Sequence, residues 1–106
     1  MQNMTDSFGL SEEVLGLLRE TFARFEKVDV VIVFGSRAMG NHRPGSDIDI
    51  AVKGSNLTAD DMQQIELALD SLGLLYKVDA LHYNSIANAA LKAHIDRVGI
   101  ALTNTE

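Results

Sequence analysis

Hydrophobic positions along the chain follow two alternating spacings, which predict helices and strands in turn. Three stretches place apolar residues three and four positions apart, as one face of a helix requires. These expected helices cover about 11–26, 58–73 and 85–97. Four shorter stretches are rich in aliphatic residues or alternate apolar with polar ones, which is typical of strands. These expected strands cover 28–34, 47–53, 75–83 and 99–102.

Polar residues mark the ends of these expected helices. Ser11 is followed by Glu12 and Glu13, and Thr58 opens the second helix in the same manner. A hydroxyl at such a position accepts a backbone N–H, and acids in the first turn complement the helix dipole. Gly73 closes the second helix. The order helix, strand, strand, helix, strand, helix, strand predicts an α/β fold.

Length and composition indicate one compact domain. The chain has 106 residues, of which 46% are apolar and 23% charged. We expect a single domain over 1–106, with a flexible segment over 1–10. The absence of cysteine excludes disulfides, a thiolate zinc site and a cysteine nucleophile. With no leader pattern and no apolar run long enough for a membrane span, we expect a cytoplasmic protein.

The formal net charge of -6 argues against broad attachment to nucleic acid. Such binding depends on basic contacts to phosphate. We therefore expect no direct nucleic-acid partner, and any phosphate to be bound locally. The acidity fits a cation site and a basic protein partner.

Asp47 and Asp49 are the first candidates for chemistry. Residues two apart in a strand point to the same face, about 6.5–7 Å from each other. Two such carboxylates repel each other, so the pKa of one should rise unless a cation intervenes. Carboxylate oxygens without thiolates or clustered imidazoles suit Mg²⁺ or Mn²⁺. The alternative is an edge strand that turns both acids to solvent, and spacing alone does not decide between them.

The residues upstream favour the metal-site interpretation. The apolar strand over 28–34 leads to Gly35-Ser36-Arg37 at an expected helix start. A glycine there permits close approach of a phosphate, and the free N–H groups of a helix start bind anions. The pattern predicts a phosphate-binding site at Gly35 and Ser36, here called the phosphate seat, followed by a metal-binding site at Asp47 and Asp49.

Asp79 is an acid inside an otherwise apolar strand, where an uncompensated charge is costly. A salt bridge to Lys77 on the same face would explain it without function. If its strand lies beside that of Asp47 and Asp49, the three acids surround one or two metal ions. Enzymes that catalyse in-line displacement at a phosphorus atom use such an arrangement. We favour the second explanation.

Together these residues resemble the signature of the DNA polymerase β-type nucleotidyltransferase superfamily. The motif runs from Gly35-Ser36-Arg37 to Ser46-Asp47-Ile48-Asp49 and ends with Asp79 on a later strand. The resemblance is to the minimal nucleotidyltransferase (MNT) branch and extends from the first helix to the end of the chain. It implies a palm-like fold with one small mixed β-sheet flanked by helices.

The resemblance also implies a role for each motif residue. Gly35 and Ser36 would hold the triphosphate of ATP. Asp47 and Asp49 would ligate two Mg²⁺ ions. Asp79 would bind the catalytic metal and activate the incoming hydroxyl, a general-base role that a poised carboxylate can fill.

Other basic residues have a less certain connection to phosphate. Arg37 is included among the nucleotide-binding candidates, although such residues also cap helices or pair with acids. Arg43 and Lys77 are weaker candidates. Met39 stands where family members often carry a second arginine, so we expect no phosphate or partner contact there. Three histidines match no metal-ligand spacing and are expected on the surface or in packing: His42, His82 and His94.

In the MNT family the usual partner is a small helical HEPN-domain toxin with RNase character, encoded alongside. The resemblance therefore implies an antitoxin that transfers AMP to a hydroxyl of that toxin, expected to be a tyrosine, in a type VII-like toxin–antitoxin pair. The short chain leaves little room for a domain that holds another acceptor. Two alternatives remain, a non-catalytic antitoxin that masks its partner and a small-molecule nucleotidyltransferase of the antibiotic-modifying kind.

Overall fold

The computed structural model describes residues 8–102, and residues 1–7 and 103–106 lie outside its description. Within that range four strands form one sheet in the order β3-β2-β1-β4. The strands are β1 (Val30–Phe34), β2 (Ile48–Lys53), β3 (Val78–His82) and β4 (Ile100–Ala101). The helices are α1 (Glu12–Ala23), α2 (Ser36–Met39), α3 (Ala59–Asp70) and α4 (Ala89–Val98), with a 3-10 turn η2 (Tyr83–Ser85). The expected α/β fold with one mixed sheet is confirmed.

Strand directions bring three strand ends together. β1 runs antiparallel to β2, whereas β2 and β3 are parallel. The carboxyl end of β1 therefore lies beside the amino ends of β2 and β3. The register makes Phe34 a Cα partner of Asp49, and Asp49 a Cα partner of Asp79. We call this part of the sheet, with Gly35, Asp47, Asp49 and Asp79, the carboxylate end.

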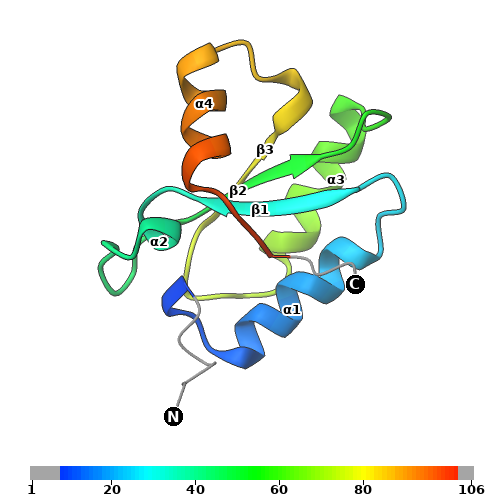
Figure 1. Cartoon of the computed structure of the whole chain (residues 1–106). Helices are drawn as coiled ribbons and strands as arrows, with labels where there is room; N and C mark the ends of the chain where they lie inside the picture. Colours follow the sequence, from blue (N-terminus) through cyan, green and yellow to red (C-terminus); the bar gives the residue numbers. More distant parts are fainter. Residues whose placement is uncertain (1–7, 103–106) are drawn as a thin grey trace.

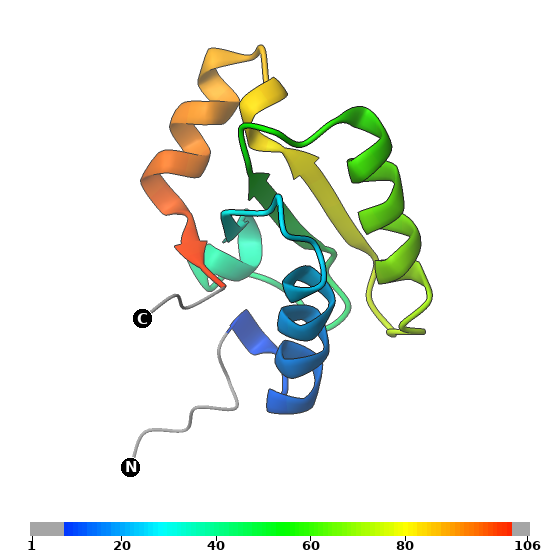
Figure 2. The same ribbon diagram turned by 90° about the vertical axis from the view of Figure 1, so that its right-hand side faces the viewer.

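Helices cover both faces of the sheet (Figures 1 and 2). α1 and α3 pack on one face, whose core includes alternate residues of β2: Ile48, Ile50 and Val52. α4 packs on the other face over a smaller core: Phe34, Ala51 and Ile95. Because successive strand residues point to opposite faces, Asp49 and Asp79 lie on the α4 side.

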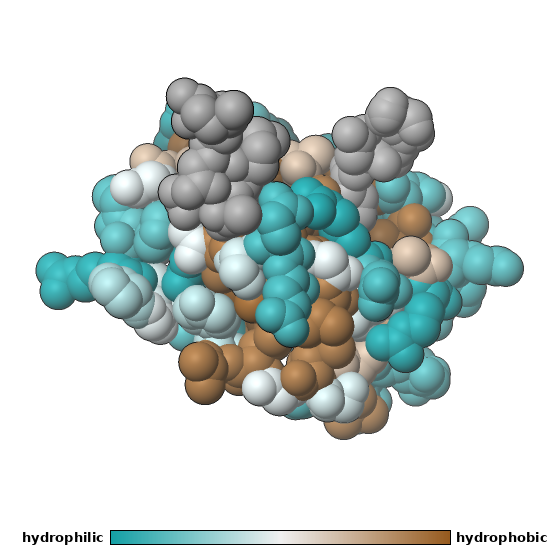
Figure 3. All heavy atoms as spheres, turned by 90° about the horizontal axis from the view of Figure 1, so that it is seen from below, coloured by the Kyte–Doolittle hydropathy of each residue, from teal (hydrophilic) through white to brown (hydrophobic). Residues whose placement is uncertain are grey.

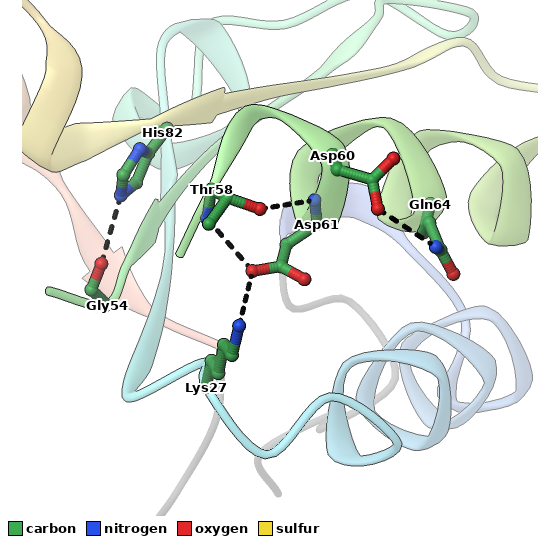
Figure 4. Close-up of polar contacts among 7 residues, drawn as sticks. All are labelled: Lys27, Gly54, Thr58, Asp60, Asp61, Gln64 and His82. Atoms are coloured by element: carbon green, nitrogen blue, oxygen red, sulfur yellow. Dashed lines mark hydrogen bonds and ion pairs between the residues drawn. The ribbon is translucent and has the colours of Figure 1, made fainter. Parts of the chain in front are cut away.

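Both expected helix caps are confirmed. Ser11 accepts a hydrogen bond from the N–H of Val14 at 3.2 Å. At α3, Thr58 Oγ1 accepts from the N–H of Asp61, and Asp61 Oδ2 accepts from the N–H of Thr58 (Figure 4). Lys27 Nζ lies 3.1 Å from the same carboxylate. The backbone hydrogen bond from Thr58, followed by that from Lys27, holds the pKa of Asp61 below its usual value.

Three helix boundaries differ from expectation. The helix expected over 58–73 ends at Asp70, three residues before Gly73. The helix expected over 85–97 begins only at Ala89, because the side chain of Asn88 accepts from the N–H of Leu91 and caps it there. The first helix ends at Ala23, before the expected 26, because the following residues bond to carbonyls three positions back.

The segment that leads into β3 also differs. The strand expected over 75–83 forms only from Val78, and Leu75 is 97% exposed. At the other end of the chain, flexibility was expected over 1–10, but Leu10 is buried in the main core. Residues 1–7 of that segment lie outside the described residues.

Some hydrophobic side chains reach the surface. Seen from below, from the side where α1 lies, hydrophobic residues gather among hydrophilic ones (Figure 3). The large exposed hydrophobic residues of the described part are Met39, Leu67, Leu75 and Ile100. In residues 8–102 no helix has the length and apolar character needed to cross a membrane.

Candidate active site

Gly35 and Asp49 are packed directly against each other. Gly35 has φ of 77°, in the left-handed region that glycine favours. A Cβ added at this position would overlap Oδ2 of Asp49. Position 35 therefore requires glycine both for its backbone angle and for its contact with the carboxylate. Ser36 then begins α2, whose first turn receives no side-chain cap.

Asp47 and Asp79 lie close enough to Asp49 for their charges to act on it, and the three differ in exposure. Asp49 is half-buried, whereas Asp47 and Asp79 are exposed. Burial raises the pKa of Asp49 above its usual value, and the negative charges of Asp79 and Asp47 raise it further. The expectation that one of the clustered acids has a raised pKa is confirmed. The carboxylate end is therefore a place where a cation would relieve repulsion.

The donor set fits a hard divalent cation. It consists of carboxylate oxygens, the ligand type that Mg²⁺ and Mn²⁺ prefer. Among residues 8–102 no three acidic, histidine or cysteine side chains are arranged to enclose an ion by themselves. Mg²⁺ is usually bound by one or two carboxylates together with substrate phosphates, so such a site does not require a closed protein cage.

The simpler explanations of the acids do not hold. β2 is a central strand between β1 and β3, which contradicts the edge-strand alternative for Asp49. Within residues 8–102 no ion pair joins Lys77 to Asp79, and the salt bridge present there links Lys27 to Asp61. In the described part of the chain, Asp79 therefore forms no ion pair with a basic side chain.

Arg37 is turned into the protein, and its side chain is buried. Its Nε and Nη2 donate to the carbonyl of Ser46 at 3.1 and 2.9 Å, and its Nη1 donates to the carbonyl of Phe8 at 2.8 Å. The guanidinium also stacks over the ring of Tyr76, 4.8 Å from the centroid. Arg37 therefore holds the loop that leads to Asp47. In this arrangement its donors bond to backbone carbonyls, and the expected contact with the triphosphate stays a prediction.

His94 is a site residue that the motif did not reveal. Its ring packs edge-on against Phe34, with centroids 6.2 Å apart and planes at 82°. Its positive charge opposes the rise in the pKa of Asp49. The helical period contained a signal, because His94 lies on the same face of α4 as Leu91 and Ile95. Its proximity to Asp49 depends on how α4 packs.

His82 is a packing histidine, as expected. Its Nε2 bonds to the carbonyl of Gly54 at 3.0 Å (Figure 4), and its Nδ1 bonds to the hydroxyl of Ser85 at 2.8 Å. Asn84 accepts from the N–H of Gly54 at 3.0 Å. These bonds fasten the end of β3 to the connection between β2 and α3, away from the carboxylate end.

Comparisons with known proteins agree with this arrangement. The model of the family described as Polymerase beta, Nucleotidyltransferase matches residues 17–106. A crystal structure of a toxin–antitoxin with AMP-PNP is 28% identical, with a TM-score of 0.65 over 89% of this chain and 73% of that chain. A mutant toxin–antitoxin MntA–HpeT structure is 27% identical, with a TM-score of 0.63 over 89% and 72%.

A more distant likeness concerns the fold alone. It is to a tri-AMPylated Shewanella oneidensis HEPN toxin in complex with MNT antitoxin, 24% identical, with a TM-score of 0.57 over 88% of this chain and 68% of that chain. No curated protein matches at a significant level. The family match spans the glycine, the three acids and every strand of the described sheet. The chain therefore belongs to the polymerase beta nucleotidyltransferase family.

Proposed function

We propose that this chain transfers AMP from ATP to a tyrosine hydroxyl of a HEPN-domain toxin and thereby neutralises it. The observation that carries the proposal is the arrangement at the carboxylate end. Asp49 and Asp79 are register partners on adjacent parallel strands, and Gly35 packs on Asp49. This arrangement supports a phosphate seat at Gly35, next to acids that repel each other.

Gly35 and Ser36 would hold the triphosphate. Gly35 has no side chain to block a phosphate, and α2 begins with uncapped N–H groups. The hydroxyl of Ser36 adds a donor. Because Arg37 bonds to the carbonyls of Phe8 and Ser46, the phosphate seat would depend on the backbone N–H groups at the start of α2 and on the hydroxyl of Ser36.

Asp47 and Asp49 would ligate Mg²⁺ together with phosphate oxygens, and Mn²⁺ has the same ligand preference. A bound divalent ion would supply electrostatic stabilisation of the phosphate charge. The raised pKa of Asp49, caused first by burial and then by its acidic neighbours, supports this role because its carboxylate lacks adequate compensation in the protein alone.

Asp79 would act on the acceptor. Its carboxylate is exposed and faces the same side of the sheet as Asp49. It would accept the proton as the tyrosine oxygen attacks the α-phosphorus in line. The bond from that phosphorus to the bridging oxygen of the β-phosphate breaks, pyrophosphate leaves, and the proton passes to water.

A protein acceptor is supported by the surface near the site. Leu75 precedes β3, whose amino end carries Asp79, and it is almost fully exposed. An exposed leucine at this position offers an apolar contact to a partner. The net charge of -6 favours association with a basic protein. The similar toxin–antitoxin structure with AMP-PNP, 28% identical, supports a toxin as the partner and ATP as the nucleotide.

The test is transfer of label from α-labelled ATP to the purified HEPN toxin in the presence of Mg²⁺. Wild type should label the toxin, and Asp79→Asn should reduce the rate about 100-fold or more, the usual worth of a general base. Asp29→Asn is the matched control, because Asp29 is an exposed acid before β1, at the opposite end of the sheet. Labelling by Asp79→Asn at the wild-type rate would remove Asp79 from the mechanism.

The same assay separates the alternatives. If Asp47→Asn with Asp49→Asn abolishes labelling but the toxin is still neutralised, masking of the partner replaces catalysis as the means of neutralisation. If wild type labels a small hydroxyl compound and leaves the toxin unlabelled, the enzyme is of the small-molecule kind. Peptide mapping of the labelled toxin identifies the acceptor residue.

A further inference from the structure

His94 reaches the carboxylate end from α4, outside the sequence motif. Its ring contacts Phe34, the residue that precedes Gly35 and pairs with Asp49 in the sheet. The imidazole therefore packs on the residue that precedes the proposed phosphate seat and lies within electrostatic reach of Asp49. The roles proposed above leave this residue unused.

Within residues 8–102 the ring nitrogens of His94 have no hydrogen-bond partner, in contrast to those of His82, which bond to Gly54 and Ser85. His94 is half-buried, so water reaches it only in part. An imidazole always carries at least one N–H. Beside a phosphate seat, that donor has a natural acceptor in a phosphate oxygen.

Two positions of the motif, 37 and 39, supply no free basic donor to the seat. The guanidinium of Arg37 donates hydrogen bonds to the carbonyls of Phe8 and Ser46, and Met39 carries no charge. An ATP phosphate chain carries several negative charges, which proteins commonly meet with basic side chains. His94 is the basic group that the packing of α4 brings to Asp49.

We propose that His94 donates a hydrogen bond to the phosphate chain of the bound nucleoside triphosphate. The contact places α4 in nucleotide binding and gives the site a basic residue from outside the Gly-Ser and Asp-x-Asp motif. This inference rests on the proposed function, because it requires the triphosphate to lie at Gly35 and Ser36.

A competing explanation makes an opposite prediction. If His94 serves only to offset the charge of Asp49, its removal leaves the carboxylates more negative and Mg²⁺–nucleotide binding unchanged or tighter. If His94 holds the phosphate chain, its removal weakens that binding. The sign of the change in affinity therefore distinguishes the two.

The experiment is calorimetric titration of the full chain with Mg²⁺ and AMP-PNP. His94→Leu keeps an apolar group against Phe34 and should weaken binding about tenfold, the worth of one charge-assisted hydrogen bond. His94→Gln retains a donor and should recover part of the affinity. Lys92→Gln, on the same helix with its ammonium over Tyr83, removes a positive charge elsewhere and should remain within about twofold of wild type.

Thermal unfolding of each variant without ligand separates folding from binding. Affinity of His94→Leu equal to or above wild type would overturn the proposal, as would equal weakening by Lys92→Gln. Failure of wild type to bind Mg²⁺ and AMP-PNP would overturn it too. If wild type binds the nucleotide but labels no toxin, the proposed transfer to the toxin fails while the titrations still decide the role of His94.

Discussion

Single residues at the carboxylate end differ in what surrounds them, although the motif presents them alike. Asp49 is half-buried beside Gly35, and its pKa is raised by burial and by its acidic neighbours. Asp79 is exposed and free to meet an acceptor. Arg37 follows Gly35 and Ser36 in sequence but bonds into the interior. Adjacent motif residues therefore serve different ends.

The charged carboxylate of Asp49 should lower the stability of the metal-free protein, although the proposed transfer requires it. Because its pKa is raised in the folded protein, the folded state binds its proton more tightly than the unfolded state. Stability is therefore lost as pH rises from the ordinary aspartate pKa through the raised one, and it stays lower above that window. In EDTA at pH 7, Asp49→Asn should raise the thermal midpoint while abolishing transfer.

The control for Asp49→Asn is pH itself. Below the ordinary aspartate pKa both folded and unfolded states are protonated, so the gain of the variant over wild type should vanish. Thermal unfolding at several pH values in EDTA measures this. A variant less stable than wild type at pH 7 would show that the carboxylate is favourably compensated in the metal-free protein.

Arg37→Met should destabilise the fold by about 2–4 kcal/mol, because buried carbonyls of Ser46 and Phe8 lose charged donors. Urea unfolding measures the loss. Arg43→Met changes an exposed side chain in the loop that carries Ser46. Its free energy of unfolding should stay within about 0.5 kcal/mol of wild type. Unchanged stability with lost nucleotide affinity would instead restore Arg37 as a phosphate contact.

At the scale of elements, the short helix α2 connects Gly35 to the loop that carries Asp47. Gly35 precedes it and Gly40 follows it, with φ of 77° and 81°. Both have positive φ, but ψ is -154° at Gly35 and 8° at Gly40, so only Gly40 has the left-handed helical conformation. Their surroundings differ as well. A Cβ at Gly35 would meet Asp49, whereas one at Gly40 would meet nothing within 4 Å. The two positions therefore differ both in backbone conformation and in what an added side chain would meet.

Gly40→Ala should cost about 1–2 kcal/mol, the strain of a left-handed alanine. Gly35→Ala should cost at least about 1 kcal/mol more, since its backbone lies in a region that only glycine adopts readily and its methyl group also displaces the carboxylate of Asp49. Urea unfolding gives both values, and titration with Mg²⁺ and AMP-PNP should show lost binding only for Gly35→Ala. Equal effects of the two changes would mean that the overlap with Asp49 relaxes without consequence.

For the whole molecule, binding of Mg²⁺ and nucleotide should raise the free energy of unfolding. Mg²⁺ with AMP-PNP at about 100 times the dissociation constant should stabilise wild type by about 2.7 kcal/mol. The variant carrying Asp47→Asn and Asp49→Asn should show no such gain. Thermal unfolding with and without ligand measures both. A gain retained in the double variant would place the nucleotide elsewhere.

Local physics allowed much of this protein to be predicted from its sequence. Helix starts depend on one side chain and nearby N–H groups, so Ser11 and Thr58 identified them correctly. Element type follows from each segment's own hydrophobic period. Gly35 was predicted at a phosphate seat because a glycine before a helix start lets a phosphate approach closely, and the structure adds its contact with Asp49.

Long-range packing decided the rest. Periodicity reports only which face of its own element a residue occupies, and not which element that face meets. Strand order made Asp49 and Asp79 register partners and made β2 central. Packing also turned Arg37 inward and brought His94 to Asp49 from a helix far along the chain. The sequence by itself determined the elements and the motif, and the tertiary structure decided which side chains face the site, because that depends on contacts between distant segments.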